Sequence, residues 1–133
     1  MLKSSNKKAY KHCERLWDEI VFIRSGGKCE LTGQTNNCSR HHYWGKSTYA
    51  LRFDPNNGVY LTYKKHIAGV HSTDPSISTE ARKELDEYMV KREGVKGVEK
   101  IKMQKNVIKS DIKLIEIYLM NYLNNLREGL SDR

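Results

Sequence analysis

The spacing of apolar residues predicts an amphipathic helix near the start of the chain. Between residues 5 and 24, apolar side chains recur at intervals of three and four residues, which is the period of one helix face. The run Ser25-Gly26-Gly27 ends this pattern, because glycine readily adopts the backbone conformation found just beyond a helix. We therefore expect an N-terminal helix over 5–24.

The segment 28–72 has the pattern of two strands followed by a helix. The run 54–58, Asp-Pro-Asn-Asn-Gly, consists of residues that favour turns, and three of the next four residues favour strands. The expected elements are a short strand at 38–44, a connector or short strand at 49–53, a second strand at 59–62 and a helix at 64–70 that ends near His71. Together they predict a ββα unit.

Residues 76–127 predict a helical extension, since their apolar positions again follow a helical period. The first expected helix is capped by Ser78 or Thr79 and runs to about residue 93. Gly94 and Gly97 interrupt the pattern, and a short helix is expected at 98–105. The last expected helix is capped by Ser110-Asp111 and runs to residue 127. The whole chain, 1–133, is then predicted to be a single α+β domain, with the ββα unit flanked by the N-terminal helix and the C-terminal helices.

The last of these helices carries more apolar residues than one core-facing stripe requires. Two interpretations stay open. The helix is fully buried in a small monomer, or it contacts the core with one face and a second copy of the chain with another. A homodimer formed in the second way would have twofold symmetry.

Composition is that of a globular domain, with 133 residues, of which 38% are hydrophobic and 30% charged. No stretch approaches the ~20 apolar residues that a membrane span needs. The N-terminus is basic and lacks the apolar region of a signal peptide. We therefore expect a cytoplasmic protein without a membrane partner.

The net charge of +8 favours polyanionic partners. Nucleic acid is the commonest of these. Charge alone says nothing of chemistry, so it supports a nucleic-acid partner only together with a candidate site.

The three cysteines, Cys13, Cys29 and Cys38, argue against a disulfide framework because their number is odd. Cys29 opens the spacing of a zinc knuckle, but Thr32 stands where the second thiolate belongs. A second knuckle would place thiolates at Thr62 and Lys65. We expect no structural zinc.

Four of the five histidines lie between residues 41 and 71. His41 and His42 are adjacent, so one imidazole can bind a metal while the other takes a proton from water. His66 and His71 are five residues apart, and on an α-helix the residue at i+5 is rotated away from the face of residue i. A helix end at Gly69 would let His71 turn back.

Asn57 precedes Gly58 in the predicted turn, where its amide can bond across the loop and fix both strands. Each feature alone has an ordinary structural explanation, since single histidines are usually surface or core residues and Asn-Gly is a common turn. Several of them in this order on a ββα pattern favour a site.

These residues resemble the HNH endonucleases, which share a ββα-metal fold and are named for His, Asn and His in chain order. Here the order is His42, Asn57 and His66, with separations of 15 and then 9 residues that look like those in the nuclease domain of bacterial DNase colicins. The resemblance implies that His42 is the general base and that His41, His66 and His71 bind one divalent metal ion. It gives Asn57 the scaffolding role.

A second resemblance is carried by short segments along the chain: 17–20 (Trp-Asp-Glu-Ile), 23–24 (Ile-Arg), 28–29 (Lys-Cys), 51–57 (Leu-Arg-Phe-Asp-Pro-Asn-Asn) and, more loosely, Tyr88, 94–95 (Gly-Val) and 98–99 (Val-Glu). These segments resemble the NinG-type recombination endonucleases of bacteriophages, and the resemblance covers roughly residues 15–127. It implies cleavage of branched or recombination-intermediate DNA, including Holliday junctions, in a host cell's cytoplasm. The chain departs from that family in its degenerate zinc knuckles and in having His41-His42 where Gly-His is usual.

Basic residues flank the candidate site and are expected to contact double-stranded or branched DNA through its phosphates. These residues are Arg40, Lys46, Arg52, Lys64 and Lys65. Availability in the cell favours Mg²⁺ or Mn²⁺ as the metal, whereas a histidine-rich site also accepts Zn²⁺ or Ni²⁺.

Three other functions stay open. The chain could be a non-catalytic nucleic-acid-binding module, or an HNH enzyme that nicks DNA nonspecifically or at particular sequences. It could also be a domain stabilised by zinc bound to Cys29, Cys38 and histidines.

Overall fold

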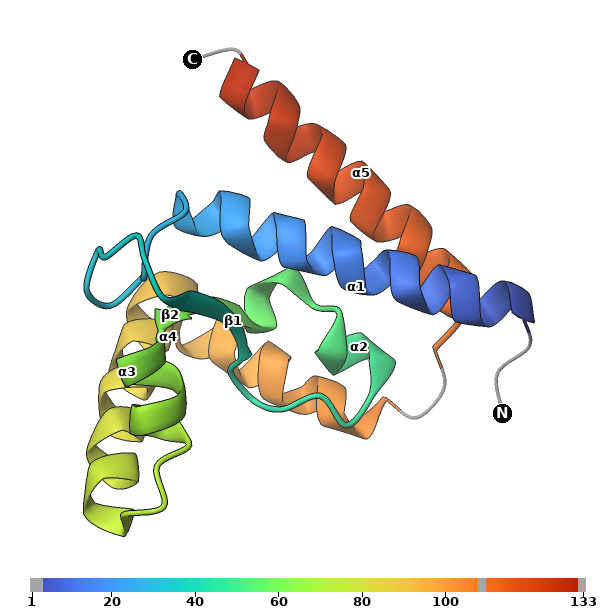
Figure 1. Ribbon diagram of the computed structural model, residues 1–133. Coiled ribbons are helices and arrows are strands. Elements are labelled where there is room, and N and C mark those ends of the chain that lie inside the picture. Colours follow the sequence, from blue (N-terminus) through green and yellow to red (C-terminus); the bar gives the residue numbers. More distant parts are fainter. Residues whose placement is uncertain (1–3, 108–109, 132–133) are drawn as a thin grey trace.

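Helices and one two-stranded antiparallel sheet form the described part of the chain, residues 4–107 and 110–131 of a computed structural model (Figure 1). This mixture agrees with the predicted α+β class. The predicted single domain, 1–133, also includes residues 1–3, 108–109 and 132–133, which lie outside the described residues. In chain order the elements are helix α1 (Ser4–Ser25), strand β1 (Cys38–His42), helix α2 (Tyr49–Arg52), the 3₁₀ turn η1 (Pro55–Asn57), strand β2 (Gly58–Thr62), the helical turn α3 (Tyr63–Lys65), the π-helical turn η2 (His66–Val70), helix α4 (Pro75–Met103), the 3₁₀ turn η3 (Gln104–Asn106) and helix α5 (Ile112–Ser131).

The β1–β2 hairpin lies between two helical layers. Because neighbouring residues of a strand face opposite sides, β2 contributes Tyr60 to a core shared with α1 and α5. It contributes Val59 and Leu61 to a second core, which it shares with α4. All five residues of β2 are buried as a result.

Gly58 allows α1 to pack directly on the hairpin. A Cβ atom at this position would lie 2.2 Å from Cγ2 of Val21 and 2.9 Å from Cζ2 of Trp17. Any side chain would therefore push α1 away from β2. Gly58 also lies opposite His42 in the strand register, so this close approach brings Trp17 next to that histidine.

Two expectations about local structure are wrong. Residues 49–53 form helix α2 and its C-terminal cap instead of a connector or strand, because the Thr48 hydroxyl caps the helix by accepting a 3.1 Å bond from the amide of Leu51. Helix α4 begins at Pro75 and not after Ser78 or Thr79. Its cap is Asp74, whose carboxylate accepts a 2.9 Å bond from the amide of Ser76.

The break predicted after residue 93 lies at Gly94, whose φ of 79° interrupts the helical backbone of α4. Helical structure resumes at once, so the short helix expected at 98–105 is the end of α4, followed by η3. The last helix starts as predicted, since the Asp111 carboxylate accepts a 2.9 Å bond from the amide of Lys113.

Helix α5 packs against α1 with one face only (Figure 1). That face buries Ile112, Leu119 and Leu123. Leu114 and Ile117, on another face, remain 64% and 54% exposed. The expectation of a fully buried helix is therefore wrong. Among the described residues, no helix is both long enough and apolar enough to cross a membrane.

Candidate metal centre

His66 and His71 come together through a π-helical turn. The amide of His71 donates a 3.0 Å hydrogen bond to the carbonyl of His66, which is the i→i+5 pattern of a π-helix. On an α-helix the two residues would point about 140° apart. The wider π-helical turn places His71 on the same face as His66. The five-residue spacing, which does not fit one face of an α-helix, is therefore compatible with a shared site.

Gly69 supports this turn in a different way from the one expected. It does not end the helix, which continues to Val70. A Cβ atom at Gly69 would lie 2.9 Å from the carbonyl oxygen of Lys64 and 3.3 Å from Cβ of Ala81 on α4. The missing side chain therefore lets α4 and the preceding turn pack closely on η2.

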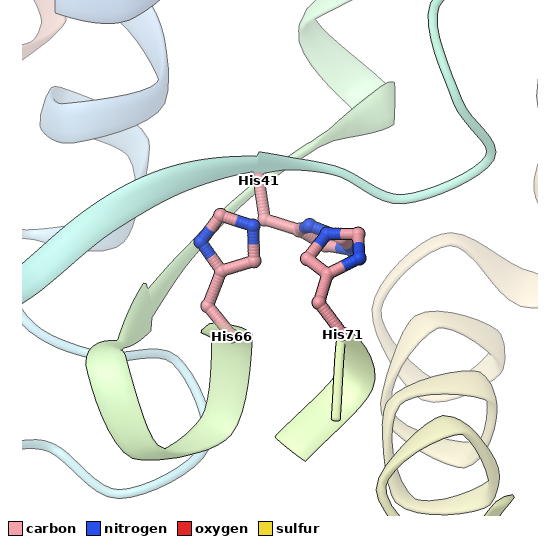
Figure 2. Close-up of side chains that lie close together, drawn as sticks. All are labelled: His41, His66 and His71. Carbon is pink, nitrogen blue, oxygen red and sulfur yellow. The ribbon is translucent and has the colours of Figure 1, made fainter. Parts of the chain in front are cut away.

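The side chains of His41, His66 and His71 converge on one point. Figure 2 shows His41 reaching from β1 toward the other two, which project from the helical segment. Each residue offers one ring nitrogen, and these three atoms all lie within 4.8 Å of one another. A divalent ion binds imidazole nitrogens at about 2.0–2.1 Å, so small side-chain movements would complete such a site. The three histidines could hold a metal ion.

His41 is the most informative member of this cluster. Its side chain is buried, and Nε2 has no hydrogen-bond partner among the described residues. A buried nitrogen without a partner is costly, and a metal ion would supply one. Burial, together with the neighbouring His66, lowers the pKa of His41 to about 3. The ring is therefore neutral at physiological pH, which is the form that binds metal.

Ser39 fixes the orientation of His66. Its hydroxyl lies 2.8 Å from Nδ1 of His66, which leaves Nε2 of that ring for a ligand. Burial lowers the pKa of His66 as well, and the nearby His71 contributes in the same direction. Ser39 was not among the predicted site residues. Its position two residues before His41, on the same face of the strand, is the signal that would have identified it.

His42 lies outside the three-histidine cluster. Its ring stacks on Trp17 of α1, with centroids 4.1 Å apart and planes 4° from parallel. Nε2 lies 3.0 Å from the carbonyl oxygen of Arg52. Because a carbonyl can only accept, Nε2 carries the hydrogen and Nδ1 of the neutral ring is left with its lone pair. Burial lowers the pKa of His42 to about 4.

Trp17, like Ser39, was not among the predicted site residues. Its indole Nε1 donates a 2.9 Å bond to the carbonyl of Asp54, so its ring is fixed where it stacks on His42. The helical period of α1 does not distinguish Trp17 from its other apolar residues, and the NinG resemblance that includes Trp17 predicts no role for it. Only the packing of α1 on the hairpin shows this contact.

Asn57 is completely buried and connects both ends of the loop between the strands. Its Oδ1 accepts a 2.8 Å bond from the amide of Trp44. Its Nδ2 donates 2.9 Å bonds to the carbonyls of Gly45 and Leu51. The Asn57 side chain therefore holds this loop together. Arg52, which follows Leu51 in the loop, accepts the hydrogen bond from His42 through its carbonyl.

The five predicted DNA contacts lie in different surroundings. Arg40 faces α1, where Nε donates to the carbonyl of Asp18 and the guanidinium lies over the rings of Phe22 and Tyr60. Arg52 lies over the ring of Tyr10.

The three predicted lysines differ from one another. Lys65 forms a 2.9 Å ion pair with Glu84 of α4. Lys46 and Lys64 are exposed, so these two are the most accessible of the five predicted cations.

The cysteines lie apart from this centre. Cys29 is buried in the loop before β1, and Cys38 begins β1. Within the described ranges, 4–107 and 110–131, His41, His66 and His71 form the group that could hold a metal ion. Cys29 and Cys38 do not belong to that group.

Comparison with known proteins found no matching family model, no matching curated sequence and no matching solved structure. The resemblance to HNH and NinG-type endonucleases therefore stays a hypothesis based on residues of this chain.

Proposed function

We propose that this protein is a metal-dependent endonuclease that hydrolyses phosphodiester bonds in DNA. The observation that supports this most is the convergence of His41, His66 and His71, with His42 next to it on the same strand. The proposed metal is one divalent ion, Mg²⁺ or Mn²⁺, and the imidazole donors also suit Zn²⁺ or Ni²⁺.

A bound ion would act as a Lewis acid that stabilises negative charge on phosphate oxygens during hydrolysis. The protein's part is to keep His41 and His66 neutral and to orient the ring of His66. Burial does the first, since it lowers the pKa of His41 and His66. Ser39 does the second by occupying Nδ1 of His66.

His42 is the proposed general base. Nδ1 of His42 would remove a proton from water while the water oxygen forms a bond to phosphorus. The bond between phosphorus and the 3′ oxygen breaks, the electron pair leaves with that oxygen, and solvent protonates it. The products are a 3′ hydroxyl and a 5′ phosphate. Trp17 and the carbonyl of Arg52 are positioning groups for this ring.

The net charge of +8 supports a nucleic-acid substrate. Branched or recombination-intermediate bacteriophage DNA is proposed as the substrate because of the sequence resemblance. A homodimer through α5 would suit such a substrate, since two symmetric cuts need two active sites.

Helix α5 has features that favour a second copy as its partner. Its exposed face includes Leu114, Ile117 and Tyr118. The positive charges of Lys113 and Arg127 are balanced by Glu116 and Glu128 along α5, in a chain of net charge +8. Two copies can therefore meet at α5 without bringing together their excess positive charge.

Cleavage of supercoiled plasmid and of a four-way junction tests the proposal. We expect wild type to cut in Mg²⁺ or Mn²⁺ and not in EDTA, and His42→Ala to lose at least 100-fold in rate. His12→Ala is the matched control, because His12 lies on α1 and bonds to Glu116 of α5. Equal cleavage by wild type and His42→Ala would refute the proposed function. The plasmid-to-junction rate ratio distinguishes nonspecific nicking from junction cleavage.

A further inference from the structure

A hollow lies between the first halves of α1 and α5. All of its lining residues come from these two helices, and none of them belongs to the three-histidine cluster. Figure 1 shows α5 on one side of α1 and the β1–β2 hairpin, which carries His41, on the other. The hollow is therefore a surface separate from the candidate metal centre.

The lining of this hollow has an excess of positive charge. It contains four lysine or arginine side chains and a single carboxylate, Glu116. The four cations are Lys8, Lys11, Arg15 and Lys113, and all of them are exposed. Among residues 4–107 and 110–131, none of the four forms an ion pair. Glu116 instead accepts a 2.8 Å bond from Nδ1 of His12. The four cations therefore remain available to an anionic partner.

The three cations of α1 form a row. Lys8, Lys11 and Arg15 are three and then four residues apart, which places them on one side of the helix. At a rise of about 1.5 Å per residue, the row is about 10.5 Å long. One strand of duplex DNA carries a phosphate for about every 3.4 Å of helix axis, so a row of this length spans about three phosphates. Lys113 reaches the same hollow from α5. An extended chain of phosphates fits this arrangement better than one small anion does.

The lining offers little to an apolar partner. Apart from Ala9, its side chains are polar or charged. The buried centre of a protein–protein interface is apolar and is often anchored by aromatic side chains. Helices that lie on a membrane insert large apolar side chains into it. The surface therefore favours nucleic acid over an acidic protein or an anionic membrane.

We propose that the α1–α5 hollow binds the phosphate backbone of duplex DNA through Lys8, Lys11, Arg15 and Lys113. Such contacts position the duplex independently of its base sequence and take no part in hydrolysis. None of the five cations predicted from the sequence to contact DNA lines this hollow. That the bound DNA is also cut rests on the proposed function, whereas the binding itself does not.

Fluorescence anisotropy of a short labelled DNA duplex in EDTA measures binding without metal and without cleavage. We expect wild type to bind the duplex. The triple variant Lys8→Gln, Lys11→Gln, Arg15→Gln should bind at least tenfold more weakly at about 0.1 M salt. The slope of log affinity against log salt concentration should become shallower by about 0.9 for each lost contact. The expected decrease is about 2.7 for the triple variant and about 0.9 for Lys113→Gln.

The matched control is the triple variant Lys91→Gln, Lys96→Gln, Lys100→Gln, which removes the same charge from exposed positions on α4. Its affinity should stay within about threefold of wild type, because screened charges act weakly at a distance. Circular dichroism checks the fold of each variant. Lys113→Gln, on the other helix, provides the second test if the α1 variant does not fold.

Three results would overturn the inference. They are an absence of duplex binding by wild type, equal weakening by the α1 and α4 triple variants, or a dependence on the α1 cations that is found with phosphatidylglycerol vesicles and not with DNA. The proposed function can fail separately. Duplex binding that depends on the hollow, by a protein that leaves plasmid intact in Mn²⁺, refutes the nuclease and keeps this surface. Plasmid cleavage by a protein whose duplex binding is unaffected by the α1 substitutions does the reverse.

Discussion

The amide of His71 donates to the carbonyl of His66 across a single π-helical turn, and this bond brings both imidazoles to the same candidate metal centre. An α-helical turn would separate the two rings. Short π-helical turns inside helices are rare and occur frequently at functional sites. The geometry of η2 is therefore as important to the candidate site as the identity of its histidines.

Gly69→Ala should weaken metal binding although Gly69 is not a ligand. The added methyl group would meet the carbonyl of Lys64 at 2.9 Å, so η2 or α4 must move. We expect Zn²⁺ affinity to fall at least tenfold and the free energy of unfolding to fall by about 1–3 kcal/mol. Calorimetric titration with Zn²⁺ and urea unfolding measure the two effects.

Gly129→Ala is the control for this substitution, because a Cβ atom at Gly129 of α5 meets nothing within 4 Å. It should leave Zn²⁺ binding unchanged and stabilise the helix by about 1 kcal/mol. Wild-type Zn²⁺ affinity in Gly69→Ala would show that the π-helical turn does not depend on this glycine.

Ser39→Ala should lower metal affinity about 10- to 100-fold, as expected for loss of the group that orients a metal-binding histidine. The hydroxyl of Ser39 lies 2.8 Å from Nδ1 of His66, and without it the ring can adopt the other tautomer. Nitrogen-15 NMR of the histidine rings reports the tautomer, and Zn²⁺ titration reports affinity. Ser47→Ala, at an exposed loop position, is the control. An unchanged tautomer would contradict the role given to Ser39.

Stability should fall in strong alkali because of Tyr88. Burial, together with its 2.6 Å bond to Glu30, raises the pKa of Tyr88 to about 12. The unfolded value is about 10, so this contribution is complete below pH 10 and is lost as the pH rises through 12. Urea unfolding at pH 8 and pH 11 should show a smaller loss in Tyr88→Phe than in wild type, by an amount on the order of 1 kcal/mol.

Tyr63→Phe is the comparison for the alkaline experiment, because the side chain of Tyr63 is 60% exposed. It should behave as wild type at both pH values. Lysine deprotonation affects all three proteins alike and cancels in the comparison. Equal losses in wild type and Tyr88→Phe would mean that the Tyr88–Glu30 contact contributes nothing in this pH range.

The α5 surface should mediate a dimer at tens of micromolar protein. Replacing Leu114 and Ile117 by lysine puts two charges on the exposed apolar face, and sedimentation velocity should then show a monomer. The control changes Ile77 and Val95 to lysine, since both are exposed on α4. A wild-type monomer at these concentrations, or equal dissociation by both double variants, would remove the dimer from the proposal.

Much of the architecture follows from local signals. The period of α1, the turn residues before Gly58 and the cap at Asp111 are each contained in a few consecutive residues, and they predicted elements close to those observed. The errors lie where a single polar side chain decides the outcome. Thr48 starts a helix where a connector or strand was expected, and Asp74 starts α4 earlier than Ser78.

By itself the sequence determined which residues could form a metal centre, because His41, His66 and His71 are rare residue types grouped on a recognisable pattern of strands and helix. Only the tertiary structure decided how they meet. The π-helical turn depends on close packing between η2 and α4 at Gly69, and the separate position of His42 depends on α1 contacting Gly58. Contacts between segments far apart in the chain leave no periodic signal in either segment, and the stacking of Trp17 on His42 therefore could not be predicted from the helical period of α1.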